Sequence, residues 1–196
     1  MKDTTNVKDR IIEVTTAMIE QHAGDTKAIT ARVIAEKADV GLGLINYHFG
    51  SKENLITTCV QRIISNVVTA GVKVNEEYDT DKDHLIAKAT HVFNFLFENA
   101  AVSRISILGD LQNYSANSNS AYTQRGFMTS LTRDVAEQDK ALLSFILTAT
   151  MQIAFLGSGS IKEILGYDLE IPKERAAYIE KVVTILFEGG KKEVSL

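Results

Sequence analysis

Outward-facing side chains that could contact the bases of DNA occur in one short segment, residues 42–49. Ile45 and Phe49 lie four residues apart, so in a helix they would share one face and anchor it from behind. The opposite face, which would enter a major groove, carries Leu42, Gly43, Asn46 and Tyr47. Only Asn46 could make a two-point contact, with adenine, whereas Leu42 could pack on a thymine methyl group. This chemistry predicts operator half-sites rich in A·T pairs.

The residues before this segment predict the element that would position it. Thr30 can cap a short helix over residues 31–38. Ala35 and Ala38 are small enough for the next helix to cross closely, and Val40 would plug the tight turn between the two. Two short helices joined by a turn of three to four residues containing glycine form a helix-turn-helix. Many helical hairpins share this pattern and bind nothing.

Apolar residues at helical spacing predict one helix before this pair and one after it. The helix before it would end at a capping Gly24 and bury Val7, Ile11, Val14 and Met18. The helix after it would be capped by Ser51 and bury Ile56, Val60, Ile63 and Val67. We therefore expect a three-helix, helix-turn-helix DNA-binding domain over residues 1–50 and a connecting helix over residues 51–74.

The tract AITARVIAEKADVGLGLINYHFGSKENLI resembles the N-terminal DNA-binding domain of the tetracycline-repressor (TetR) family. The resemblance covers about the first 60 residues, and INYHFGSKENL is its most distinctive part. It implies a homodimer with a ligand pocket in the C-terminal domain. Ligand binding there would shift the two recognition helices and release the operator.

The resemblance also implies which residues contact DNA. A hydroxyl and amide at a helix start, as at Thr30, favour phosphate. Arg32 and Lys52 would neutralise phosphates on either side of the groove, and Tyr47 and His48 can donate to phosphate oxygens. Such contacts position a protein without reading sequence. The full set is Thr30, Arg32, Leu42, Gly43, Leu44, Asn46, Tyr47, His48 and Lys52.

One departure from the family pattern lies at Gly41-Leu42-Gly43-Leu44. Members commonly carry Ser or Thr at this helix start, followed by a basic or polar residue. Glycine caps without a side-chain bond, and Gly43 inside the helix costs about 1 kcal/mol against alanine. We therefore expect this helix to be loose in the free protein and to become firmer on DNA. The change also removes the usual readers of guanine; Leu44 could pack on a thymine methyl or instead face the core.

Composition indicates a folded, all-α, soluble protein, because 45% of the 196 residues are hydrophobic and there is one proline. The net charge of −4 gives nucleic-acid binding no support, so phosphate contacts must depend on where the cations lie. A single cysteine, Cys59, and no hydrophobic leader favour a cytoplasmic protein. The apolar tract 141–157 is interrupted by polar residues and is shorter than the ~20 residues of a membrane span, which favours a buried helix.

The acidic stretch 75–83 is the expected domain boundary, with a larger helical effector-binding and dimerisation domain over residues 75–196. Helices are predicted at about 84–99, 103–114, 121–138, 140 onwards, and from Pro172 to Gly189-Gly190. Homodimerisation through residues 141–156 and the last helix would form a four-helix bundle. An apolar or aromatic effector would contact some of His91, Asn94, Tyr114, Met128, Thr148, Met151, Gln152 and Phe155, each of which is otherwise plain core.

Other chemistry has little support in the sequence. The four histidines are scattered without paired carboxylates, so no metal site is predicted, and no cofactor is expected. Cys59 is expected to be a packed thiol, and Gly157 and Gly159 to mark a close helix contact or a bend. No phosphate loop or nucleophile elbow occurs, which argues against a helical enzyme.

The first hypothesis is a ligand-responsive repressor; the alternative is a helical small-molecule-binding protein with weak or no operator binding. Effector, operator sequence, regulated genes and repressor versus activator are not readable.

Overall fold

The computed structural model describes residues 2–22, 28–71, 78–132 and 136–189, with side chains for 7–22, 28–63, 78–132 and 136–189. The predicted cap Gly24, the side chain of Val67, the boundary at residue 75 and Gly190 lie outside these residues. The described part is all-α and holds no strand. Its elements are α1 (Lys2–Gln21), α2 (Ala31–Lys37), α3 (Leu42–Phe49), α4 (Lys52–Gly71), α5 (Asp81–Glu98), α6 (Ala100–Gln112), α7 (Asn119–Met128), α8 (Glu137–Leu156), α9 (Ser158–Leu165) and α10 (Pro172–Gly189).

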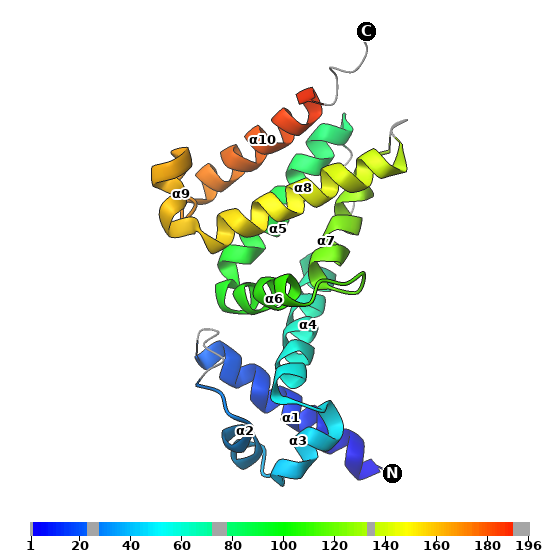
Figure 1. Ribbon diagram of the computed structural model, residues 1–196, viewed down its shortest axis with the longest axis vertical. Helices are drawn as coiled ribbons and strands as arrows, with labels where there is room; N and C mark the ends of the chain where they lie inside the picture. The colour runs from blue at the N-terminus through cyan, green and yellow to red at the C-terminus, as the bar shows by residue number, and fades with distance from the viewer. Residues whose placement is uncertain (1, 23–27, 72–77, 133–135, 190–196) are drawn as a thin grey trace. The chain divides into compact units, whose positions relative to one another are not determined.

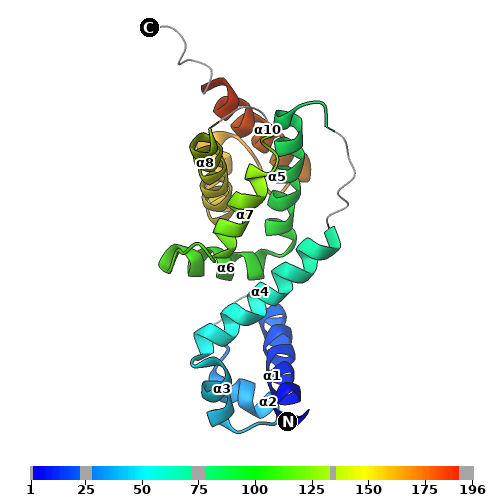
Figure 2. The ribbon, with the colours of Figure 1, turned by 90° about the vertical axis from the view of Figure 1, so that its right-hand side faces the viewer.

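The chain forms two compact units, which Figure 1 and Figure 2 show from two directions. The first comprises Met1–Val74 and Asn99–Asn113, so it holds α1 to α4 and α6. The second comprises Asn75–Glu98 and Tyr114–Leu196, so it holds α5 and α7 to α10.

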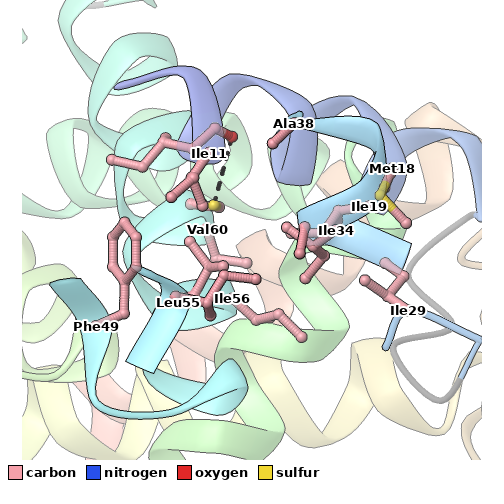
Figure 3. Close-up of a cluster of buried hydrophobic side chains, with 14 of the residues drawn as sticks. Ile11, Met18, Ile19, Ile29, Ile34, Ala38, Phe49, Leu55, Ile56 and Val60 are labelled. Carbon is pink, nitrogen blue, oxygen red and sulfur yellow. Dashed lines mark hydrogen bonds between the residues drawn. The ribbon is translucent and has the colours of Figure 1, made fainter. Parts of the chain in front are cut away.

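The first unit is built around isoleucines that the sequence spaces for one helix face. Ile11 and Ile19 of α1 are completely buried, and Ile56 and Val60 of α4 pack in the same cluster (Figure 3). α2 and α3 contribute Ile34 and the other inward residues that the sequence indicates. Burial of each such side chain contributes about 1.5–3 kcal/mol, so this core fixes the short helices that could not form alone.

Helix α6 belongs to the first unit, although the sequence boundary at residue 75 assigns it to the second domain. Val102 is buried in the first unit's core, and Ile105 packs against that core. The apolar period of α6 predicts that one of its faces is buried, but not which helices cover that face. The first unit is therefore assembled from two separate stretches of the chain.

In the second unit α5 packs along α10, and α7 packs along α8 (Figures 1 and 2). Leu85, Ala89 and Phe93 recur every four residues along α5 and are completely buried. On α10, Ile179 and Val183 have the same four-residue spacing and are buried together with Tyr178. These apolar stripes join α5 and α10 into the central pair of this unit.

The helix predicted over residues 121–138 is wrong at its C-terminal end, because α7 stops at Met128. Asp81 explains part of this difference. Its carboxylate accepts hydrogen bonds from the backbone N–H of Thr132 at 2.9 Å and from the Thr132 hydroxyl at 2.7 Å. This contact from α5 satisfies an N–H group that a continuing helix would have bonded to its own carbonyl.

The region after residue 140 contains two helices, α8 and α9, which meet at Gly157. Gly157 therefore marks a bend, one of the two expected roles for these glycines. By length and composition alone, α8 could cross a membrane, and 33% of its apolar window is buried inside the unit. A single helix of this kind is weak evidence for a membrane protein, because core helices of soluble proteins share the same composition.

Candidate nucleic-acid interface

Helix α3 presents the face that the sequence predicts. Ile45 is completely buried and Phe49 is 9% exposed, so these two residues anchor the helix to the core of the first unit. On the other side Tyr47 is 77% exposed and Leu42 is 49% exposed. Asn46 is exposed beside them. At this exposure the Tyr47 ring and the Leu42 side chain are both accessible to a partner.

Helix α2 begins at the predicted cap. The backbone N–H of Val33 donates to the Thr30 hydroxyl at 3.2 Å, and Thr30 has extended backbone angles. Ile34 and Ala35 are buried, while Arg32 is exposed on the opposite side. The N-terminus of α2 is therefore fixed, and the Arg32 side chain lies outside the core.

The turn between α2 and α3 is held by hydrogen bonds and by an unusual backbone angle. Asp39 has φ of 51°, a left-handed conformation that aspartate tolerates better than most residues. The Val40 N–H donates to the Ala35 carbonyl at 3.0 Å. Val40 itself packs, half-buried, against the core, as its predicted role in the turn requires.

Two α1 residues support this turn and α3, and sequence reasoning missed both. The Arg10 guanidinium donates to the Asp39 carbonyl at 3.2 Å. The Lys8 ammonium lies 5.8 Å from the centroid of the Phe49 ring. Exposed cations on an amphipathic helix look like solvated surface in a sequence, so no local pattern reveals that they reach across to other helices.

Helix α4 starts at the predicted cap Ser51, whose hydroxyl accepts from the Asn54 N–H at 3.1 Å. Lys52, in the first turn, is partly buried and lies 3.7 Å from the Glu53 carboxylate. An exposed pair of this length contributes at most about 1 kcal/mol. A phosphate could therefore compete with Glu53 for the Lys52 ammonium.

His48 differs from the other expected contacts because it is half-buried. Its ring lies edge-on between Tyr47 at 5.0 Å and Phe49 at 6.1 Å. Its Nε2 atom is buried and has no hydrogen-bond partner in the described part of the chain. A phosphate contact from Nε2 therefore requires the His48 ring to turn.

The two glycines of α3 have room for a side chain. Gly41 caps the helix with extended backbone angles and no side-chain bond, as expected from its type. A Cβ added at Gly41 or Gly43 would meet no atom within 4 Å. Leu44, the residue with two possible roles, is half-buried.

Sequence and fold comparisons address this geometry directly. Residues 11–59, which run from the middle of α1 into α4, match the family described as "Bacterial regulatory proteins, tetR family". This part of the chain therefore resembles the DNA-binding domain of the TetR family. The match indicates the helix-turn-helix of a DNA-binding transcriptional regulator, and α3 is the second helix of that motif. Members of this family bind DNA operators, usually dimerise and are generally not enzymes.

The fold of the whole chain is similar to that of two solved TetR regulators. A TetR transcriptional regulator from Rhodococcus sp. RHA1 has a TM-score of 0.59 and 16% identity, with 100% of each chain covered. A TetR-like transcriptional regulator from the same organism has a TM-score of 0.56 and 16% identity, covering 94% of this chain and 95% of that one. No curated protein sequence matches the chain.

The residues predicted to contact an effector are only partly brought together in the second unit. Thr148, Met151 and Phe155 are buried on α8, whereas His91 and Tyr114 are exposed. Met128, Asn94 and Gln152 are half-buried. The Gln152 amide donates to the Ser120 hydroxyl at 2.7 Å, and the Asn94 side-chain oxygen accepts from the Arg175 guanidinium at 2.7 Å.

A groove of about 280 Å³ lies elsewhere, between α1 and α4 of the first unit. It contains none of the predicted effector residues. Its lining residues are Ile12, Glu13, Thr16, Ala17, Glu20, Arg62 and Ile63.

Proposed function

We propose that this chain is a TetR-family repressor that binds a palindromic operator as a homodimer and leaves it when a small molecule binds. The observation that carries the proposal is the face of α3. Ile45 and Phe49 fix the helix, while Leu42, Asn46 and Tyr47 stand exposed together. A helix anchored and exposed in this way can enter a major groove without rearranging the core.

The proposed DNA contacts divide into two groups. Thr30, Arg32, Tyr47, His48 and Lys52 would bind phosphate and fix the position of the protein. Leu42, Gly43, Leu44 and Asn46 would face the bases, with Asn46 on adenine and leucine methyl groups on thymine. This division supports half-sites rich in A·T pairs.

The proposed dimer surface lies on α8. Leu142, Phe145, Ile146 and Ile153 are all exposed, and their spacing places them on one face of the helix. On α10 the exposed large hydrophobic residue is Ile185, so this helix offers less apolar surface than its sequence suggested. Pairing both helices with their counterparts would bury these side chains in a four-helix bundle.

The remaining assignments are also proposals. The effector would bind in the second unit, near the buried α8 residues Thr148, Met151 and Phe155, and the protein would act in the cytoplasm. Functionally the chain would divide into a DNA-binding domain at 1–50, a connecting helix at 51–74 and an effector-binding and dimerisation domain at 75–196, although α6 of this last range packs in the first unit. It would need neither a metal nor a cofactor.

A gel shift at two salt concentrations, with random DNA and with DNA selected by the protein, tests the operator proposal. Specific binding should survive at the higher salt, because base contacts do not depend on counterion release as phosphate contacts do. Selected sequences should be palindromic with A·T-rich half-sites. G·C-rich half-sites would contradict the assigned base contacts.

A second candidate function is a small-molecule-binding protein that has lost operator binding. It is favoured by Gly41 and Gly43, which leave the start of α3 without polar side chains. The same gel shift separates the two functions, since equal binding to random and selected DNA supports the second.

A further inference from the structure

A buried positive charge lies inside the second unit. Arg175, in the first turn of α10, is only 5% exposed. Arginine is almost never fully buried unless it is paired. Yet the ion pairs formed by the described residues do not include Arg175. The adjacent Glu174 carboxylate instead accepts from the Asp168 N–H at 2.6 Å.

Neutral groups hold this guanidinium in place. Its Nε donates to the Asn94 side-chain oxygen at 2.7 Å. Its Nη1 donates to the carbonyls of Leu169 at 2.9 Å and Glu170 at 3.2 Å. A guanidinium has five N–H donors, and these bonds use the one on Nε and the two on Nη1. Within the described residues, the two donors of Nη2 have no hydrogen bond, and no carboxylate forms an ion pair with the guanidinium.

Aromatic rings surround the same group. The guanidinium lies 4.8 Å from the centroid of the Phe97 ring. Phe97 in turn contacts Phe155 of α8 at 5.2 Å and Phe93 at 5.3 Å. Phe93 stacks with Tyr178, one turn after Arg175 on α10, at 5.7 Å. The charge therefore lies at the edge of an aromatic cluster drawn from α5, α8 and α10.

We propose that Nη2 of Arg175 binds the carboxylate of the effector, and that the aromatic cluster packs against an aromatic body on that molecule. This inference rests on the proposed ligand-responsive function and adds a negative charge to the expected apolar or aromatic ligand. A buried charge is costly unless it is paired, and dipoles alone pair it incompletely. A carboxylate would complete the pairing with an opposite charge and two acceptor oxygens, whereas an amide of the same shape offers one acceptor oxygen and no charge.

The test compares matched acids and amides on the full-length protein. The probes are benzoate and phenylpropionate against benzamide and phenylpropionamide, at constant ionic strength and pH 7. Titration calorimetry and thermal unfolding measure binding to the free protein. We expect the carboxylates to bind and raise the Tm, and the amides to bind at least about tenfold more weakly. Equal binding of acid and amide, or no binding of either carboxylate, overturns the proposal.

Variants assign the binding to Arg175. Arg175→Met, which keeps the bulk and removes the charge, should lose carboxylate binding at least about tenfold. The matched control is Arg125→Met on α7, where an exposed arginine also stacks on a ring, Tyr122, at 4.4 Å and donates to a carbonyl, that of Ala116, at 2.8 Å. This control should bind as the unmodified protein does. Unchanged carboxylate binding in Arg175→Met overturns the proposal.

If Arg175→Met fails to fold by circular dichroism, Arg175→Lys decides the point. Lysine keeps the charge but lacks the forked donors, so carboxylate affinity should fall while the preference for acid over amide persists. Loss of that preference, or unchanged affinity, counts against the proposal. Operator binding without any ligand is measured separately by gel shift, so failure of the effector site is distinguishable from failure of the DNA-binding function.

Discussion

At the scale of single residues, Asn46 is exposed on α3, and its amide can donate to and accept from the edge of one adenine at the same time. We expect Asn46→Ala to relax the preference for adenine at one position of each half-site by about 1–3 kcal/mol. Binding measured to operators that differ at each position in turn checks this. A uniform loss across all operators would instead assign Asn46 to phosphate.

Arg32 should behave in the opposite way. It is exposed on α2 and is expected to contact phosphate, so Arg32→Ala should weaken binding to all sequences alike. The slope of log affinity against log salt should fall by about 1 per protomer. Arg125→Ala, in the second unit, is the control and should leave the slope unchanged. Altered sequence preference in Arg32→Ala would contradict the assignment.

The Cys59 thiol is completely buried on α4, where its Sγ lies 3.6 Å from the Ile12 carbonyl oxygen. Burial raises the pKa of this thiol from 9.0 to about 11. Because the thiolate is the reactive form, an aromatic disulfide reagent should modify the native protein very slowly at pH 8 and the unfolded protein quickly. Rapid modification of native protein would contradict this environment.

The raised pKa of Cys59 also predicts that the protein becomes less stable at high pH. The folded state favours the neutral Cys59 thiol, so this contribution to stability is complete below pH 9.0 and is lost as the pH rises towards about 11. Comparison with Cys59→Ala isolates the effect. The variant's free energy of unfolding should fall less steeply over that pH range.

The burial of a residue could be predicted where apolar residues recur at helical spacing, as at Ile45 and Phe49. Contacts made by charged side chains across helices could not. Arg10 at the turn and Arg175 inside the second unit both look like surface arginines in the sequence. Their positions depend on acceptors far along the chain, such as the Asp39 carbonyl and Asn94, which no local periodicity encodes.

At the scale of elements, α3 is the helix most open to redesign. A Cβ at Gly43 meets no atom within 4 Å, so Gly43→Ala should stabilise the protein by about 1 kcal/mol. Chemical denaturation measures the change. Amide exchange at residues 42–48 should slow in the variant, because the unmodified helix is expected to be loose without DNA. Slow exchange in the unmodified protein would contradict that expectation.

Gly109→Ala provides the matched control for Gly43→Ala. Gly109 lies inside α6, and a Cβ there also meets nothing within 4 Å. Its stability should rise by a similar amount while exchange at residues 42–48 stays as it was. Any change in operator affinity seen with Gly43→Ala alone then belongs to the recognition helix.

The sequence predicted the first residue of a helix correctly where a capping side chain sets it. Thr30 and Ser51 begin α2 and α4 through side-chain bonds that depend only on residues three positions away. The end of α7 was misplaced because Asp81, about fifty residues earlier, bonds to Thr132. Local signals therefore predicted caps, whereas tertiary contacts decided where that helix stops.

At the scale of the whole molecule, the proposed dimer depends on the exposed stripe of α8. Ile153→Glu would place a charge within the buried bundle, so the dimer should weaken by at least about tenfold. Ile153 is 59% exposed in the single chain, and the substitution should therefore leave the fold intact. Sedimentation at several concentrations measures the association.

Ile164→Glu is the matched control for the dimer. Ile164 is 69% exposed on α9 and is not part of the α8 stripe. This variant should remain dimeric and should bind operator normally, whereas Ile153→Glu should lose cooperative binding to the palindrome. Dissociation caused by Ile164→Glu instead would move the interface to α9.

The placement of α6 bears on how the two units can be recombined. The chain leaves the first unit after residue 74, builds α5 in the second, and returns at residue 99 to supply Val102. A DNA-binding fragment cut at residue 74 would lack one wall of its own core. A chimera that joins this DNA-binding unit to another effector-binding domain must therefore include α6 as well as α1 to α4. The segment that can be transferred does not end at α4.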